Sequence, residues 1–256
     1  MDKVHIIMAE FGEKRNNNGG GSKALTGRFE PSLSSINNIF PDSHKTMYTN
    51  IHKTGEDCEL SKFDNIISVD EQQYAWANHF KSGNRLSDYF KIKGALESLT
   101  SGANFAIAID SDMVFYEKFK LCVKLVKKFD ILLPINPRGL VINDCYGVSN
   151  DGILLNDEPE EFKWSTSYNC SPMVFNNSVT SINFLREVLQ EFEKTPARLP
   201  LVLSRAAFKT ATSPYALSRH WCVCAGDVDV DKFKPPSSPL VLHVGHEVVA
   251  KHYGVI

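Results

Sequence analysis

Short apolar runs alternate along the chain with longer stretches in which apolar residues recur every three or four positions. The apolar runs predict strands over residues 3–11, 45–50, 66–69, 105–109, 130–135 and 240–244. The helical spacing predicts helices over residues 31–40, 72–80, 85–99, 117–129, 181–193 and 199–208. Strands that alternate with helices in this way predict an α/β fold with a mostly parallel sheet flanked by helices.

The most informative stretch is residues 105–115, which reads F-A-I-A-I-D-S-D-M-V-F. Five apolar residues before Asp110 fit a strand that is buried on both faces. Ligands collect at the carboxyl ends of such strands, where two carboxylates are costly unless something positive neutralises them. Asp110 and Asp112 can converge on one hard cation that also binds substrate phosphates. The alternative is an ordinary Asp-rich turn after a strand.

Composition narrows the class of protein. A length of 256 residues suits one α/β domain, and 43% hydrophobic with 23% charged residues indicates a globular chain. The net charge of -2 gives no reason to expect nucleic acid or an anionic membrane as a partner. No apolar run approaches the ~20 residues of a spanning helix, and the first residues lack the pattern of a signal peptide. We therefore expect a cytoplasmic protein without a transmembrane segment.

Other segments carry weaker signals. The six cysteines are scattered except for the pair Cys222 and Cys224, and we expect buried reduced thiols because no C-x-x-C spacing of a zinc site appears. The Asn- and Gly-rich segment 12–22 lets backbone N–H groups approach a ligand closely and is expected to order over it. In the helix over residues 85–99, Phe90 is expected to face inward and Lys91 to lie on another face.

Three segments together resemble the GT-A glycosyltransferases: R-L-S-D-Y-F-K at 85–91, A-I-A-I-D-S-D-M at 106–113 and L-H-V-G-H at 242–246. Their layout is similar to the lipooligosaccharide galactosyltransferase and glycogenin group. The resemblance implies a Rossmann-like mixed, mostly parallel sheet. It also implies metal-dependent hexosyl or pentosyl transfer, with retention, from a UDP-sugar to a saccharide or other hydroxyl acceptor. Mn²⁺, or Mg²⁺, would stabilise the leaving diphosphate, and an imidazole ligand favours Mn²⁺.

The resemblance also implies roles for particular residues. The metal ligands would be the catalytic residues Asp110 and Asp112 together with His243 and His246, of which the sequence does not choose one. The nucleotide-sugar would be bound by Ala9, Glu10, Phe11, Arg85, Asp88, Lys91, Ser111 and Lys251. The chain would be a single catalytic domain, with a nucleotide-sugar half over 1–115 and an acceptor half over 116–256 that ends in a metal-binding tail.

Alternatives stay open at this point. The Lys-Pro-Trp-type ending of that group is replaced by K-H-Y-G at 251–254. A sugar-phosphate nucleotidyltransferase is suggested by G-E-K-R at 12–15 and S-K-A-L at 22–25, although the Gly spacing before Arg15 differs from that signature. A carbohydrate-binding module of the same fold without turnover is the non-enzymatic alternative. If transfer inverts, a general base is needed, and the sequence does not choose among Asp144, Asp151, Glu158, Asp227 and Asp229.

Overall fold

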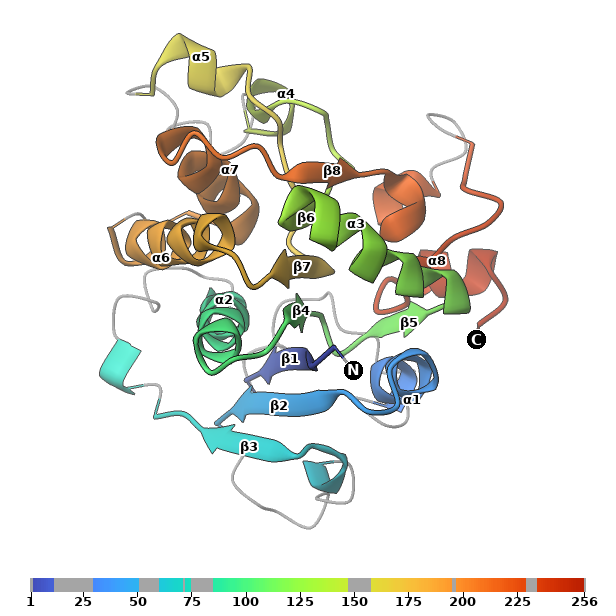
Figure 1. Ribbon diagram of the computed structural model, residues 1–256. Coiled ribbons are helices and arrows are strands. Elements are labelled where there is room, and N and C mark those ends of the chain that lie inside the picture. Colours follow the sequence, from blue (N-terminus) through green and yellow to red (C-terminus); the bar gives the residue numbers. More distant parts are fainter. Residues whose placement is uncertain are drawn as a thin grey trace.

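The computed structural model describes residues 2–11, 30–50, 60–70, 72–74, 85–146, 158–194, 197–228 and 234–255 (Figure 1). Among these, one sheet of seven strands has the order β3-β2-β1-β4-β7-β6-β8, and β5 and β9 form a second sheet. The strands are β1 (Val4–Glu10), β2 (His44–Thr49), β3 (Asn65–Ser68), β4 (Phe105–Ala108), β5 (Met113–Phe115), β6 (Ile131–Pro134), β7 (Met173–Asn176), β8 (Tyr215–Leu217) and β9 (Val241–His243).

In the described residues, the longer α-helices match the predicted ones closely, and three short helices were not predicted. The α-helices are α1 (Glu30–Ile39), α2 (Arg85–Thr100), α3 (Leu121–Phe129), α4 (Ile142–Tyr146), α5 (Glu160–Lys163), α6 (Val179–Lys194), α7 (Leu199–Lys209) and α8 (Glu247–His252), of which α4, α5 and α8 are the three that were not predicted. Single turns of 3-10 helix are η2 (Leu60–Lys62), η4 (Glu117–Lys120), η6 (Arg219–Trp221) and η7 (Ala225–Asp227). The helix expected over 72–80 falls largely outside the described residues.

The sheet is parallel at one end and mixed at the other. β1 pairs in parallel with β2 and β4, and β2 pairs in parallel with β3. β7 runs antiparallel between β4 and β6, and β6 pairs in parallel with β8. The prediction of a mixed, mostly parallel α/β sheet flanked by helices is therefore confirmed, while β7 and β8 of this sheet and β5 of the second sheet were not predicted.

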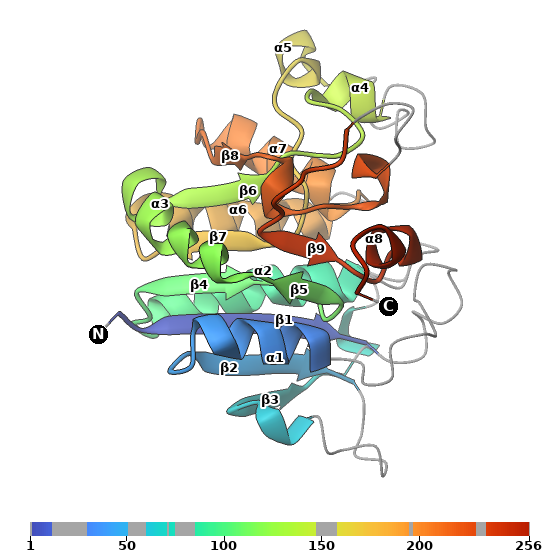
Figure 2. The ribbon, with the colours of Figure 1, turned by 90° about the vertical axis from the view of Figure 1, so that its right-hand side faces the viewer.

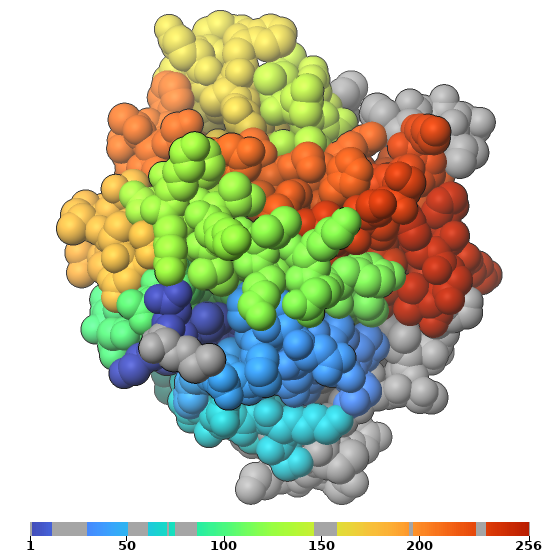
Figure 3. Space-filling model, turned by 45° about the vertical axis from the view of Figure 1, so that its right-hand side comes forward, coloured from blue at the N-terminus to red at the C-terminus, as the bar shows by residue number. Residues whose placement is uncertain are grey.

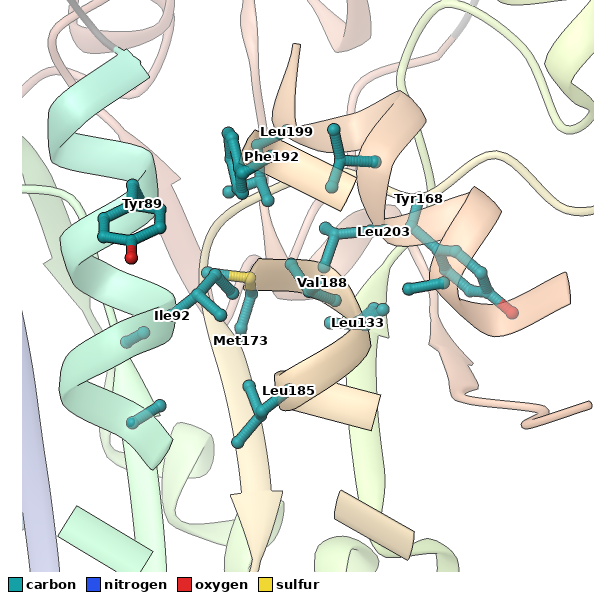
Figure 4. Packing of buried hydrophobic residues seen from close by; sticks show 14 of the residues in the cluster. Tyr89, Ile92, Leu133, Tyr168, Met173, Leu185, Val188, Phe192, Leu199 and Leu203 are labelled. Atoms are coloured by element: carbon teal, nitrogen blue, oxygen red, sulfur yellow. The ribbon is translucent and has the colours of Figure 1, made fainter. Parts of the chain in front are cut away.

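Helices cover both faces of the sheet, with α2, α6 and α7 on one side and α1 and α3 on the other (Figure 1). Alternate residues of β1 serve the two layers, since Ile7 packs in the first cluster and Ile6 in the second. Figure 4 shows Ile92 of α2, Met173 of β7 and Val188 of α6 meeting in the first layer. Each such side chain contributes about 1.5–3 kcal/mol on full burial.

Helix α2 lies against the sheet on one side and against α6 on another (Figure 4). A Cβ on Gly94 would come within 2.6 Å of the Tyr48 ring, so glycine lets α2 approach β2. Gly102 at φ +92 follows the end of the helix. The expectation that Lys91 lies away from the buried faces is wrong: the residue is 1% exposed, because a helix covered on several sides has no free face there.

The second sheet joins two distant parts of the chain. β5 and β9 pair antiparallel, with Met113 opposite His243, and Val223 forms an isolated parallel bridge with Leu242 (Figure 2). The C-terminal residues lie beside α1 and the segment that follows β5, as the space-filling view shows (Figure 3). This pairing brings β9 and the start of α8 to the turn that carries Asp110 and Asp112. Of the helices described, none has the length and apolar character needed to cross a bilayer.

Candidate metal centre

The turn between β4 and β5 is fixed by side chains from two other elements. The Ser32 hydroxyl of α1 accepts a hydrogen bond from the Met113 N–H at 2.8 Å. The same hydroxyl lies 2.9 Å from the Met113 carbonyl oxygen and 3.0 Å from that of Asp110, within reach as a donor. The Asp110 N–H donates to Ser171 Oγ at 3.0 Å. Because buried backbone groups need partners, these two serines hold the turn that presents both carboxylates.

Lys91 neutralises the first aspartate. Its Nζ lies 2.5 Å from Asp110 Oδ1 and 2.9 Å from Asp88 Oδ1, and its side chain is only 2% exposed. Burial acts to lower the pKa of Lys91, but the two carboxylates outweigh it and raise that pKa well above its ordinary value. Burial likewise opposes ionisation of Asp110, yet Lys91 and then His243 leave the pKa of Asp110 below its usual range. Burial dominates at Asp88 and raises its pKa.

His243 faces both aspartates. Its Nε2 lies 2.9 Å from Asp112 Oδ1 and 4.0 Å from Asp110 Oδ2. Burial acts to lower the pKa of His243, but the Asp112 carboxylate outweighs burial and raises it well above the usual range. One ligand atom each from Asp110, Asp112 and His243 lies within 4.8 Å of the other two. The structure thus brings together the two aspartates and one of the two histidines that the sequence left open.

Gly245 is a residue of the site that sequence reasoning missed. A Cβ at this position would lie 1.9 Å from Asp112 Oδ2 and 2.6 Å from Asp112 Cγ, a distance that no side chain tolerates. The Gly245 N–H also donates to the Asp112 carbonyl oxygen at 3.2 Å. Glycine therefore allows the chain after β9 to close over Asp112 without displacing its carboxylate. A glycine directly after a strand that carries a histidine was the available signal.

The donor atoms fit a divalent cation. Cis ligands around an octahedral ion with bonds of about 2.1 Å are separated by about 3 Å. The separations of 2.9 and 4.0 Å from His243 Nε2 are of that order. Asp110 meets Lys91 through Oδ1 and His243 through Oδ2, so one oxygen anchors the side chain while the other faces the centre. Two carboxylates and an imidazole suit Mn²⁺ better than Mg²⁺.

The residues expected to bind the nucleotide lie in different surroundings: some contact the aspartate turn and others pack in the hydrophobic core. Ser111 Oγ donates to Glu10 Oε2 at 2.7 Å, which ties the end of β1 to the aspartate turn. Glu10 is 2% exposed. Ala9 and Phe11 lie in the hydrophobic core, where the Phe11 ring centroid is 5.6 Å from that of Phe90. Glu10 thus contacts the aspartate turn through Ser111.

Other predicted residues lie apart or outside the described parts. Lys251 is on α8, with its amine 2.5 Å from Glu247 and its side chain 67% exposed. Arg85 begins α2, but its side chain lies outside the described residues, as does the segment 12–22. Among the alternative bases, Asp144 is exposed, while Asp227 is buried and pairs with Arg219 at 2.9 Å. Glu158 pairs with Arg205, and Asp151 and Asp229 fall outside the description.

Two cysteines lie on the far edge of the His243 ring. Cys224 Sγ is 3.9 Å from His243 Nδ1 and 3.5 Å from Cys222 Sγ. The hydrogen bond from Cys222 and the neighbouring His243 lower the pKa of Cys224 to about 6, although burial opposes this. The His246 ring centroid lies 4.5 Å from that of His243. The sequence predicted only buried reduced thiols at these positions. Their proximity to His243 could not be predicted, because it depends on the pairing of residues 222–224 with β9.

Comparison with known proteins bears on the fold. No protein-family profile and no curated protein sequence matches the chain. Mouse xyloside xylosyltransferase 1, in its apo form, superposes with a TM-score of 0.50 at 12% identity, over 94% of this chain and 97% of that one. The apo structure of the bifunctional glycosyltransferase WbbM gives 0.55 at 13% identity, over 94% of this chain and 45% of that one. The chain has the GT-A glycosyltransferase fold.

Proposed function

We propose that the chain is a metal-dependent glycosyltransferase that moves a sugar from a UDP-sugar to a saccharide or other hydroxyl acceptor. The observation that carries the proposal is the convergence of Asp110, Asp112 and His243 at the carboxyl end of the central strand. Ligand sites of open α/β sheets lie at such strand ends. The glycosyltransferases with the same fold support a transferase, because they share this architecture over 94% of the chain.

The charges of the centre support a cation. When Asp88, Asp110 and Asp112 are ionised, Lys91 is protonated and His243 is neutral, as it must be to bind an ion, these five side chains sum to -2, which a divalent ion balances. Asp110, Asp112 and His243 would hold Mn²⁺, or Mg²⁺, and the ion would stabilise the charge that develops on the leaving diphosphate. Lys91 holds the Asp110 carboxylate ionised and in place. Its amine is committed to two carboxylates, so we assign it to positioning Asp110 and not to the diphosphate.

The remaining contacts are part of the proposal. Ala9, Glu10 and Phe11 at the end of β1 would bind the uridine side of the donor, with Ser111 beside them. Arg85 and Lys251 would meet the diphosphate. Residues 1–115 would then form the donor half and 116–256 the acceptor half. Support comes from the metal ligands themselves, since Asp110 and Asp112 come from the first half and His243 from the second. Transfer of a hexose or pentose with retention follows from the resemblance to the galactosyltransferase and glycogenin group.

A donor screen tests the proposal. Purified protein is incubated with Mn²⁺ and a panel of nucleotide sugars, and thermal shift and released nucleotide are measured. We expect one UDP-sugar to raise the melting temperature with Mn²⁺ and to release UDP, and both effects to vanish in EDTA. Asp112→Asn should show neither effect. Release of pyrophosphate from a nucleoside triphosphate and a sugar phosphate would instead identify a nucleotidyltransferase. A donor that binds without any turnover would indicate a binding module.

A further inference from the structure

A second group of metal-ligating side chains meets at the other edge of the His243 ring. Ligand atoms of Cys224, His243 and His246 all lie within 4.8 Å of one another. On this edge Cys224 Sγ faces His243 Nδ1 at 3.9 Å, whereas Nε2 of the same ring faces Asp112. Cys224 is buried, while His243 and His246 keep partial exposure through which an ion can enter.

The backbone places the three side chains together. The Val223 N–H donates to the Val241 carbonyl at 3.0 Å, and the His243 N–H donates to the Val223 carbonyl at 3.0 Å. The Cys224 N–H donates to Asp227 Oδ2 at 2.8 Å, which fixes the residue at the start of η7. His246 caps α8, and its N–H donates to the His243 carbonyl at 3.2 Å. The group is therefore set by strand pairing and two helix starts.

We propose that Cys224, His243 and His246 form a second metal site, selective for Zn²⁺ or a similarly soft divalent ion. One thiolate and two imidazoles are ligands that zinc prefers, and tetrahedral bonds of about 2.3 Å to sulfur and 2.0 Å to nitrogen give an S–N edge of about 3.5 Å. The observed Sγ–Nδ1 separation is 3.9 Å. Cys222 is not part of this group, but its Sγ at 3.5 Å from Cys224 Sγ offers a second thiol.

The two sites share one imidazole and therefore exclude each other. A neutral histidine has one N–H and one nitrogen lone pair, so it ligates a single ion at a time. An ion on Nδ1 requires the proton on Nε2, where it points at Asp112 Oδ1, 2.9 Å away. An ion on Nε2 requires the proton on Nδ1, where it points at Cys224 Sγ. Zinc at the cysteine edge thus removes the imidazole from the aspartate site.

A consequence for activity rests on the proposed function. If turnover needs an ion held by Asp110, Asp112 and His243, zinc at the cysteine edge inhibits it. The inhibition is relieved by added Mn²⁺ and not by added donor, because the two ions compete for one ring. In Cys224→Ser the same zinc concentration should inhibit less.

Binding of Co²⁺ tests for the second metal site without any assay of turnover. The purified full chain, kept reduced, is titrated with Co²⁺ alone, and the near-ultraviolet band that arises when a thiolate binds Co²⁺ is measured. We expect the band at saturation in the wild type and its loss in Cys224→Ser. His246→Gln should need at least about tenfold more Co²⁺, since loss of even an outer-shell partner costs 10–100-fold. Absence of the band from the wild type would overturn the inference.

Variants at other positions test whether the cobalt–thiolate band comes from this site. Cys145→Ser removes a buried thiol that hydrogen-bonds Gly139, away from the histidines, and should keep the band. Asp112→Asn should keep it as well, because Asp112 belongs to the other edge. If Cys224→Ser does not fold, the wild-type band and its response to His246→Gln still test the inference, because His246 is partly exposed and its substitution should not prevent folding. A band that is unchanged in His246→Gln would contradict the proposed ligand set.

Competition distinguishes the two proposals. Bound Mn²⁺ is measured from the loss of the free-ion electron paramagnetic resonance signal, and Zn²⁺ is then added. Release of Mn²⁺ by one equivalent of Zn²⁺, but not in Cys224→Ser, supports mutual exclusion. Simultaneous binding of both ions would contradict it. A cobalt–thiolate band in a protein that binds no Mn²⁺ would leave the second site standing while the metal-dependent function fails.

Discussion

Asp110 and Asp112 stand two residues apart, yet different parts of the protein hold their side chains in place. Asp110 pairs with Lys91 of α2, and its backbone N–H binds Ser171. Asp112 is held by His243 and covered by Gly245, both from the C-terminal segment after β8. The charge of the first aspartate is therefore compensated within the main sheet and its helices. The second depends on the docking of β9 against β5, so the centre is complete only when that pairing forms.

The largest expected effect is on turnover, and substitution of either aspartate should lower it by about the same factor. Under the proposed function, Asp110→Asn and Asp112→Asn each remove a charged ligand from the ion that would stabilise the leaving diphosphate, and loss of such a group costs about 10²–10³ in rate. Measuring kcat with saturating donor and Mn²⁺ checks this. Wild-type turnover in either variant would remove that aspartate from the centre.

Stability without metal should separate the two aspartates. Asp110→Asn removes the nearer of the two carboxylates that compensate the buried Lys91 ammonium and leaves Asp88 as its partner. We expect this to cost about 3 kcal/mol of unfolding free energy, because removing one member of a buried ion pair is strongly destabilising. Asp112→Asn loses a charged hydrogen bond to His243 and should cost about 1.5 kcal/mol. Urea unfolding in EDTA measures both. Equal losses, or a larger one at Asp112, would show that the comparison is wrong.

Gly245→Ala tests how the C-terminal segment acts on Asp112. The new Cβ would collide with Asp112 Oδ2, so the carboxylate or the turn must shift. We expect Mn²⁺ affinity to fall by about 10–100-fold, the usual effect of disturbing what orients a ligand. Gly226→Ala is the matched control, since a Cβ there meets nothing closer than 3.7 Å. Calorimetric titration with Mn²⁺ should separate the two variants, and similar affinities would argue against the steric account.

The smallest effect is expected at Lys251. Its ion pair with Glu247 on α8 is exposed to solvent, and such pairs contribute little to stability. Lys251→Ala should therefore leave both Mn²⁺ affinity and unfolding free energy nearly unchanged. A rise in KM for the donor would support the proposed contact with the diphosphate, whereas an unchanged KM would remove Lys251 from the donor site.

The parts of the centre that sequence reasoning found are those with local patterns. Asp110 and Asp112 end an apolar strand, and His243 lies within another, so each could be recognised from its neighbours. Ser32 and Ser171 could not be assigned to the site in the same way, and for Gly245 the one signal was its place after the strand that carries His243. Their contacts cross between elements far apart in sequence, and only the pairing of strands determines them.

The same reason explains the errors in the fold. The spacing of apolar residues suggested that Lys91 lies on a less buried face of α2, but that helix is covered on several sides, and the amine is accommodated by Asp88 and Asp110. Strands β7 and β8 follow directly after Pro172 and Pro214, in irregular stretches where their short apolar runs were not recognised as strands. Length alone does not explain this, because β9 also has three residues and was predicted. Where elements were longer, as in β1, α2 and α6, the predicted and observed spans agree closely.

Binding of Mn²⁺ alone tests the central claim most directly, because it needs neither donor nor acceptor. Free Mn²⁺ is followed by electron paramagnetic resonance as the ion is titrated into metal-free protein. The account predicts one bound ion per chain, no binding in Asp112→Asn, and an affinity at least about tenfold weaker in His243→Gln. Lys251→Ala should match the wild type. Mn²⁺ binding that is unchanged in Asp112→Asn and His243→Gln would contradict a centre built from Asp110, Asp112 and His243.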